Sequence, residues 1–142
     1  SSAILVITKN NKTKFYQTDL TNKRIGTQNG STHQKYLMDK YPKMTIRSYD
    51  SYQNAMLDLK NSRIDGIFGD TAVVNQWIKT DNSLITIGDK IIDPNYFGTG
   101  LGIAIRKDNL VLVQKLNKAL ISIKQDGTYQ MIYQKWFNNS VE

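Results

Sequence analysis

The sequence predicts an α/β fold, in which one sheet carries helices on its faces. Short apolar runs that suit buried strands alternate with longer segments whose apolar residues recur every three or four positions. Two of the strand-to-helix junctions carry Gly, Ser and Asp, the residue types that end strands and cap helices. The length of 142 residues is enough for one domain with a buried core.

The first two thirds of the chain follow the strand-helix alternation closely. Apolar runs bounded by polar or glycine-containing turns mark the strands, and stripes such as Tyr52, Ala55, Met56 and Leu59 mark the helices. In chain order the pattern predicts a strand at 3–8, a strand at 24–28, a helix at 32–41, a strand at 44–49, a helix after Asp50-Ser51, a strand at 66–69, a helix at 71–79 and a strand at 84–87.

The last third begins with a loop that contains Pro94 and glycines at 98, 100 and 102. Alternation of Leu101, Ile103 and Ile105 with small residues predicts a strand at 101–105, and two helices follow at 109–126 and 129–137, separated by Gly127. Both helices carry broad apolar stripes that need a surface to cover, at Leu112, Val113, Leu116, Ala119, Leu120 and Ile123, and then at Tyr129, Ile132, Tyr133, Trp136 and Phe137.

The first notable junction joins the strand at 24–28 to the helix at 32–41. Asn29-Gly30 is a turn signal, and Ser31 or Thr32 suits the helix N-cap. The first N–H groups of a helix have no partner within it and attract anions. The junction therefore indicates either a carboxylate-binding turn that includes His33 or an ordinary capped helix, and the ordinary cap is the better interpretation of this loop taken alone.

The second junction joins the strand at 66–69 to the helix at 71–79 through Asp70-Thr71. Asp70 suits an ammonium group, and it also suits a plain N-cap. Ligands of open α/β sheets gather beyond the carboxyl ends of the strands, where we expect both junctions to lie. Side by side, the two loops suit the two ends of a free amino acid.

Composition and charge exclude several classes of function. No run approaches the roughly 18 apolar residues of a membrane span, so we expect no membrane insertion. Cysteine is absent and His33 is the single histidine, so neither thiol chemistry nor a histidine-rich metal site is available. The chain also has no nucleotide-binding or metalloprotease motif. We therefore expect no enzyme activity and no cofactor. The net charge of +7 comes from dispersed lysines and arginines rather than from a cluster, which argues against nucleic acid as a partner.

Several runs of the sequence resemble the arginine-binding proteins of bacterial ABC transporters, within the basic and polar amino-acid binding proteins of the type II solute-binding fold. The resemblance covers nearly the whole chain and is carried by NGSTHQKY at 29–36, RIDGIFGDTAVVN at 63–75 and YFGTGLGIA at 96–104, together with shorter runs at 23–26, 48–54, 58–61 and 126–129. It implies a periplasmic, extracytoplasmic protein that binds L-arginine or another basic amino acid and delivers it to a transporter permease.

The resemblance also implies how the chain is organised. Residues 1–94 resemble the second, ligand-binding lobe of such proteins, and residues 95–142 resemble a crossing strand and two C-terminal helices that belong to a first lobe. Most of that first lobe has no counterpart here, including the arginine that clamps the ligand carboxylate in the family. We therefore expect weakened ligand binding and self-association through the two C-terminal helices, with Asp93–Gly102 as the hinge of a domain swap.

By resemblance, Thr32 and the N–H groups of the turn from Gly30 to His33 take the α-carboxylate, and Asp70 takes the α-ammonium. Ser31, His33 and Thr71 are further candidates around them. Two alternatives stay open from the sequence: a non-catalytic assembly module, suggested by the apolar C-terminal helices, and a basic nucleic-acid-binding domain, suggested by charge alone.

Overall fold

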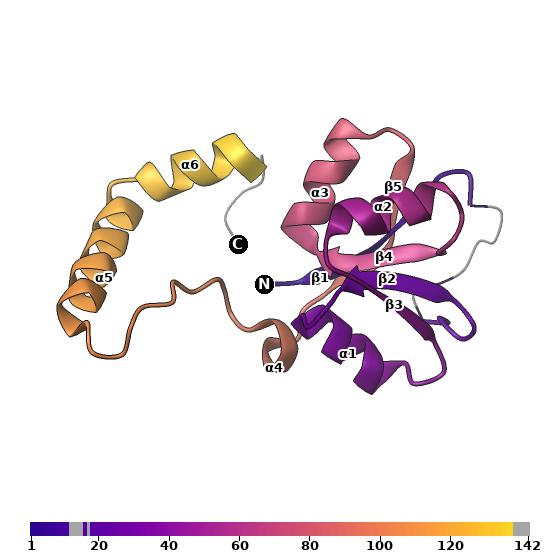
Figure 1. The fold of residues 1–142 in the computed structure, drawn as a ribbon. Helices are drawn as coiled ribbons and strands as arrows, with labels where there is room; N and C mark the ends of the chain where they lie inside the picture. The colour runs from indigo at the N-terminus through magenta and orange to yellow at the C-terminus, as the bar shows by residue number, and fades with distance from the viewer. Residues whose placement is uncertain (12–15, 17, 138–142) are drawn as a thin grey trace. The chain divides into compact units, whose positions relative to one another are not determined.

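The computed structural model describes residues 1–11, 16 and 18–137 (Figure 1). The chain divides into two compact units, which are considered separately: unit 1 is Ser1–Leu101 and unit 2 is Gly102–Glu142. Within the described residues, no helix is both long enough and apolar enough to cross a bilayer.

Unit 1 is built on a five-stranded mixed sheet with the strand order β3-β2-β4-β1-β5. The strands β2 and β4 pair in parallel, as do β2 and β3, whereas β1 runs antiparallel to both β4 and β5. The run from Ala3 to Ile7 is buried throughout, which explains why β1 is apolar on both of its faces. The strands are β1 (Ala3–Thr8), β2 (Arg24–Gln28), β3 (Thr45–Tyr49), β4 (Gly66–Asp70) and β5 (Leu84–Ile91).

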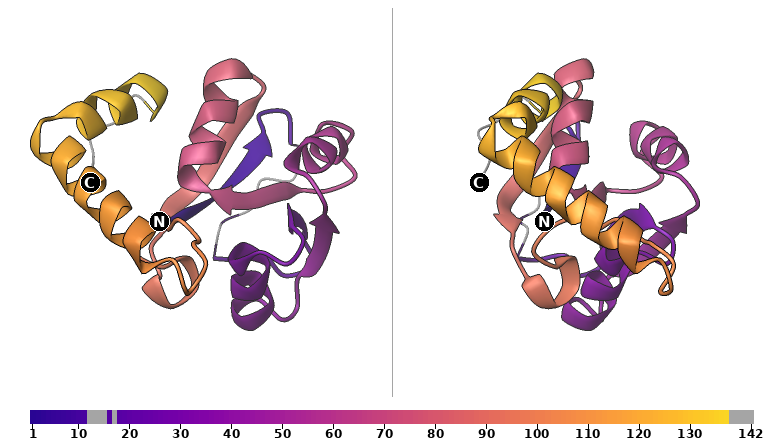
Figure 2. Two further views of the ribbon diagram at one scale, coloured as in Figure 1. Left: turned by 60° about the vertical axis from the view of Figure 1, so that its left-hand side comes forward. Right: turned by 90° about the vertical axis from the view of Figure 1, so that its left-hand side faces the viewer.

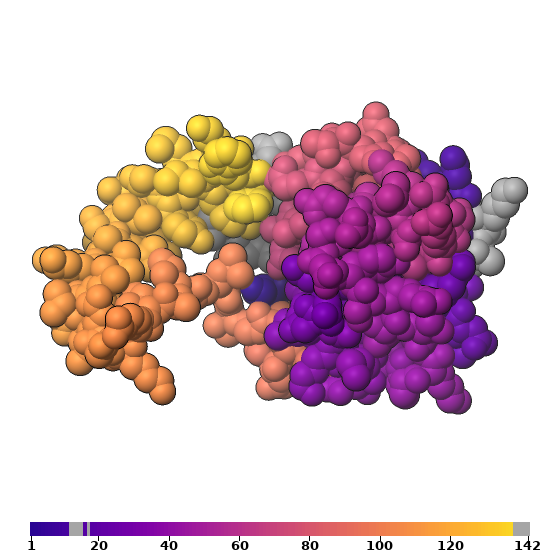
Figure 3. All heavy atoms as spheres, viewed as in Figure 1, coloured from indigo at the N-terminus to yellow at the C-terminus, as the bar shows by residue number. Residues whose placement is uncertain are grey.

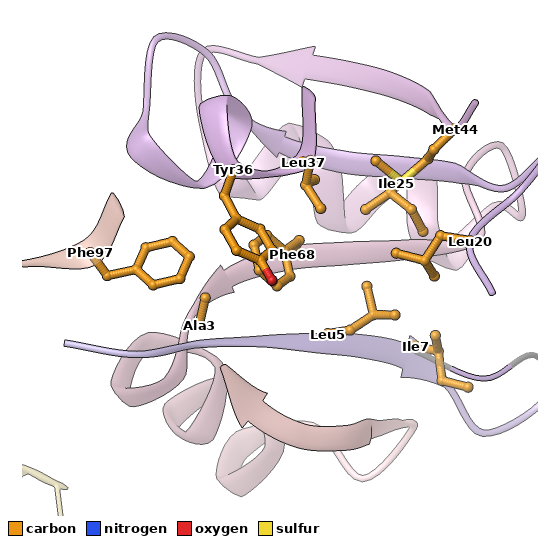
Figure 4. Packing of buried hydrophobic residues seen from close by; sticks show 10 residues of the cluster. All are labelled: Ala3, Leu5, Ile7, Leu20, Ile25, Tyr36, Leu37, Met44, Phe68 and Phe97. Carbon is orange, nitrogen blue, oxygen red and sulfur yellow. The ribbon is translucent and has the colours of Figure 1, made fainter. Parts of the chain in front are cut away.

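Helices cover both faces of this sheet (Figures 1 and 2). The cluster in Figure 4 packs residues of α1 (Thr32–Lys40) and α4 (Pro94–Phe97) on one face, where Tyr36, Leu37 and Phe97 meet Phe68 of β4. A second cluster packs α2 (Tyr52–Lys60) and α3 (Thr71–Thr80) on the other face. Alternate residues of β1 belong to the two clusters. Figure 3 shows the outer surface of unit 1 from the direction of Figure 1.

Most predicted elements of unit 1 lie within a residue or two of the observed ones, but two features were missed. The strand β5 continues to Ile91, beyond the predicted end at residue 87. The loop around Pro94 contains the short helix α4, in which Asp93 Oδ1 accepts a hydrogen bond from Asn95 N–H at 3.0 Å. An Asp cap before a proline in the first turn is a helix-start signal, so the sequence carried this information.

The strand predicted at 101–105 is wrong. Residues 101–106 are neither helix nor strand, and the side chain of Leu101 is almost fully exposed. Alternation tells which side chains suit opposite faces, but a strand also needs a neighbouring backbone to pair with. None of the described strands pairs with this segment. The assignment of 1–94 and 95–142 to two lobes stays a prediction.

Unit 2, as far as it is described, consists of the segment after Leu101 and the two predicted helices, α5 (Leu110–Gln125) and α6 (Thr128–Phe137). Its internal contacts include stacking of Tyr133 on Tyr129 and on Phe137, with ring centroids 6.4 and 4.9 Å apart. Neither helix has a buried residue, although both carry an apolar stripe. The stripes of α5 and α6 are therefore covered only in part, since residues such as Leu116, Ile123 and Tyr133 are half-buried.

We expect the 142-residue chain to self-associate through α5 and α6. Burial of apolar surface contributes about 25 cal/mol per Å², so covering a few hundred Å² favours association by several kcal/mol before entropic costs. Light scattering at micromolar concentration should show a dimer or a larger species. Leu116→Asp, on the stripe, should restore the monomer, whereas Ser122→Asp, off the stripe, should not. A compact wild-type monomer would contradict this expectation.

Candidate functional site

The two junctions singled out in the sequence lie at the same edge of the sheet. Because β2 and β4 are neighbouring parallel strands, with Ile25 opposite Gly66, their carboxyl ends point the same way. The helix α1 follows β2 after a short turn, and α3 follows β4 directly. The start of β1 reaches this edge as well, since Ala3 lies opposite Asp70.

The junction before α1 leaves two backbone donors available. Ser31 caps the helix: its Oγ accepts from Gln34 N–H at 3.2 Å and donates to the Gln28 carbonyl at 2.7 Å. The Gly30 N–H donates to Gln34 Oε1 at 2.8 Å, and Gly30 itself has a φ of 68°, which favours glycine. The next two N–H groups, of Thr32 and His33, have no acceptor among the described residues. They point out of a positive helix end, which suits an anion.

The junction before α3 is satisfied in the opposite way. Asp70 Oδ1 accepts from Ala72 N–H at 2.9 Å and from Val73 N–H at 3.4 Å. The Thr71 N–H donates to the Ser2 carbonyl at 3.0 Å, and the Thr71 hydroxyl accepts from Ser2 Oγ at 2.9 Å. The backbone donors of this first turn are therefore used. Asp70 is the cap that the ordinary interpretation predicted, and its second carboxylate oxygen has no donor within the described part of the chain.

His33 links the two junctions electrostatically. Its ring stacks on Phe97 at 5.1 Å and 26° and meets Phe68 edge-on at 5.9 Å. Its Nε2 is buried and has no hydrogen-bond partner among the described residues. Burial lowers the pKa of His33 below its ordinary value of 6.5, and the charge of Asp70 acts in the opposite direction. The neutral imidazole is therefore the form that fits this packing.

Tyr52 is a neighbour of the site that the sequence reasoning missed. Burial, followed by the charge of Asp70, raises the pKa of Tyr52 to about 12. The ring lies over the end of β4, where a Cβ added at Gly69 would come within 3.0 Å of the Tyr52 hydroxyl oxygen. The apolar periodicity of α2 assigned Tyr52 to the core stripe only. Its position directly after Ser51, at a third strand-to-helix junction, was the available signal.

The structure therefore brings the six predicted residues to one edge of the sheet, but only some of them have polar groups that are available to a ligand. Thr32, His33 and Asp70 offer groups that have no partner among the residues that the structure describes. Polar groups of Gly30, Ser31 and Thr71 form hydrogen bonds with other residues of the chain, and these bonds hold the turns in shape. The site thus combines a pair of N–H donors with a free carboxylate oxygen.

Two other kinds of candidate site within the described residues are less suited to bind a ligand. A cavity of about 320 Å³ lies at the opposite ends of β2 and β4 and is lined by Arg24 and Asp65, among others. These two side chains pair with each other at 3.0 Å, so their charges are already compensated. The described residues contain no cluster of three or more His, Asp or Glu side chains that suits a metal ion.

Comparison with known proteins gives one family. The model of the bacterial extracellular solute-binding proteins, family 3, matches residues 2–139. Among curated relatives from Escherichia coli K12, ABC transporter arginine-binding protein 1 is 57% identical over 137 residues, which is 96% of this chain and 56% of the relative. The putative ABC transporter arginine-binding protein 2 is 61% identical over 118 residues, 83% of this chain and 49% of the relative.

A solved structure agrees with these matches. A Salmonella typhimurium periplasmic binding protein, described for its high arginine specificity, superposes with a TM-score of 0.85 at 43% identity, and the match covers 96% of this chain and 60% of that one. The chain therefore spans about half the length of the curated relatives that it matches.

His33 should make the stability of unit 1 dependent on pH. The folded state holds the imidazole at a lowered pKa, so the unfolded chain takes up its proton first as the pH falls. The contribution of neutral His33 is complete above the unfolded value of 6.5 and is lost as the pH falls from there through the lower folded pKa. Urea midpoints measured by circular dichroism should drop across this window. His33→Gln should remove that part of the slope, and identical slopes in both proteins would exclude His33 as the cause.

Proposed function

Because this chain belongs to the bacterial extracellular solute-binding proteins of family 3, we propose that it is an amino-acid-binding part of an ABC importer and that its ligand is L-arginine. The ligand-binding residues lie at the edge of the sheet where α1 and α3 begin. A transporter permease is the partner that such a protein delivers to. The relatives' names support arginine as the ligand, and the geometry supports a free α-amino acid.

The proposal rests on one observation: of two neighbouring helix starts, one offers hydrogen-bond donors and the other offers a negatively charged acceptor. Within the described part of the chain, the first turn of α1 has two N–H donors without an acceptor, and the Asp70 cap of α3 has a carboxylate oxygen without a donor. The strands β2 and β4 are direct neighbours that pair in parallel, so both helix starts lie at the same edge of the sheet, where one small ligand with two opposite charges suits them. The carboxylate of the ligand suits α1, and its ammonium suits Asp70.

The other predicted residues have supporting roles in this arrangement. The exposed Thr32 hydroxyl adds a third donor beside the two N–H groups. Ser31 and Gly30 hold the turn in shape, and Thr71 fixes the start of α3 against Ser2. His33 supplies one N–H group and packs its ring behind the turn. The negative charge of Asp70 attracts the ligand ammonium locally, in a chain whose net charge of +7 repels cations.

The 142-residue chain should bind L-arginine weakly, in the millimolar range or below detection. A micromolar complex corresponds to about 8 kcal/mol, and loss of one charge-paired clamp on a ligand carboxylate costs about 2–5 kcal/mol. The chain spans only about half the length of each relative, and the family resemblance implies that the arginine that clamps the ligand carboxylate belongs to the part that is not matched. Titration calorimetry checks this. Submicromolar binding by a proven monomer would contradict it.

Asp70→Asn should weaken arginine binding roughly 10- to 100-fold, the equivalent of about 1.5–3 kcal/mol for a hydrogen bond to a charged group. The fold should survive, because Asn also accepts the Ala72 and Val73 N–H groups as an N-cap. Two-dimensional NMR titration with L-arginine measures affinity in the millimolar range. Asp126→Asn is the matched control, since it removes the same charge from an aspartate that accepts the Thr128 N–H in unit 2.

N-acetyl-L-arginine separates the two ends of the ligand in the same experiment. It keeps the carboxylate and lacks the ammonium, so Asp70→Asn should not weaken its binding further. Equal affinity of wild type and Asp70→Asn for free arginine would reduce Asp70 to a helix cap and remove the proposed ammonium site.

A further inference from the structure

The short helix α4 is held against both ends of α1. At the first turn of α1, the buried ring of Phe97 stacks on His33 and also meets Tyr36 at 5.3 Å. At the last turn, the Tyr96 hydroxyl donates to Asp39 Oδ2 at 2.8 Å. The two contacts come from adjacent residues of α4 but differ in kind, one aromatic and buried and the other polar and exposed.

The backbone and the ring of His33 have different surroundings. Its backbone N–H is one of the two donors at the start of α1 that have no acceptor among the described residues, and its ring is packed between Phe97 and Phe68. No hydrogen bond from a described residue holds the buried Nε2. The position of the ring therefore depends on aromatic packing, and Phe97 supplies its nearest stacking contact.

The chain directly after Phe97 is rich in glycine and loosely surrounded by other atoms. Gly98 has a φ of 65°, a conformation that favours glycine, and a Cβ placed at Gly100 or Gly102 would meet no atom within 4 Å. The boundary between units 1 and 2 falls in the same stretch, between residues 101 and 102. Phe97 is thus the last well-packed residue before a glycine-rich connection.

We propose that Phe97 is a positioning residue for the donor turn of α1, and that the ring of His33 transmits the position of α4 to the N–H groups of Thr32 and His33. The role of that turn as a carboxylate site rests on the proposed function, but the positioning itself is a property of the unliganded chain. A displacement of the connection at 98–102 that moved α4 would therefore alter the donor turn.

The test compares Phe97→Leu with Tyr96→Phe in the full chain without ligand. Phe97→Leu removes the stack on His33 and keeps an apolar side chain, whereas Tyr96→Phe removes only the bond to Asp39. His33 is the single histidine, so its imidazole signals in an NMR titration are unambiguous. Phe97→Leu should shift these signals, raise the pKa of His33 towards 6.5 and move the Thr32 and His33 amide signals. Tyr96→Phe should leave all three close to wild type.

Two results would overturn the inference. One is an unchanged donor turn in folded Phe97→Leu, and the other is an equal effect of both variants, which would mean that any loosening of α4 suffices. If Phe97→Leu fails to fold by circular dichroism, Phe97→Met replaces the ring with an unbranched, flexible side chain of about the volume of leucine and gives the same comparison.

A separate titration with L-arginine keeps this inference distinct from the proposed function. A Phe97→Leu effect, together with arginine-dependent shifts of the wild type that lie away from Thr32, His33 and Asp70, would refute the ligand site and leave the positioning intact. Arginine-dependent shifts together with no Phe97 effect would refute the positioning and leave the ligand site intact.

Discussion

The parallel pairing of β2 with β4 sets the geometry of the candidate site. Each strand ends at the same edge of the sheet and leads into a helix, so the starts of α1 and α3 must lie beside each other. What differs is how each helix start satisfies its own backbone. At α1, Ser31 caps the helix and Gln34 accepts the Gly30 N–H, but the N–H groups of the next two residues have no acceptor among the described residues. At α3, Asp70 and Ser2 accept the first backbone N–H groups, and one carboxylate oxygen of Asp70 is left without a described donor. One strand pairing thus produces a site with positive and negative halves.

The surroundings of Asp70 explain why capping and ligand binding are compatible. One oxygen serves the Ala72 and Val73 N–H groups, and the other remains available. The charge is felt by His33 and by Tyr52, which approach from α1 and α2. The site is therefore framed by helices on both faces of the sheet. The helix α4 also borders the site, because its Phe97 packs on His33, and the glycine-rich connection at Gly98–Gly102 comes directly after α4.

The sequence predicted the parts of this molecule that depend on local chemistry. The α/β fold is confirmed, and so is the family resemblance, since the chain belongs to the bacterial extracellular solute-binding proteins of family 3. The caps at Ser31 and Asp70 were readable because capping uses residues within one turn. The predicted strand at 101–105 was wrong because the residues of a segment do not show whether another strand lies beside it to pair with. Tyr52 was missed because apolar periodicity does not distinguish an aromatic ring in the core from one that lies near a charged group. Ligand contacts of the six residues stay a prediction.

A crystal structure of the chain with L-arginine at saturating concentration is the decisive test of this binding geometry. We expect the α-carboxylate within hydrogen-bond distance of the Thr32 and His33 N–H groups and the α-ammonium on the second carboxylate oxygen of Asp70. Arginine bound in the reverse orientation, or bound away from the starts of α1 and α3, would contradict it.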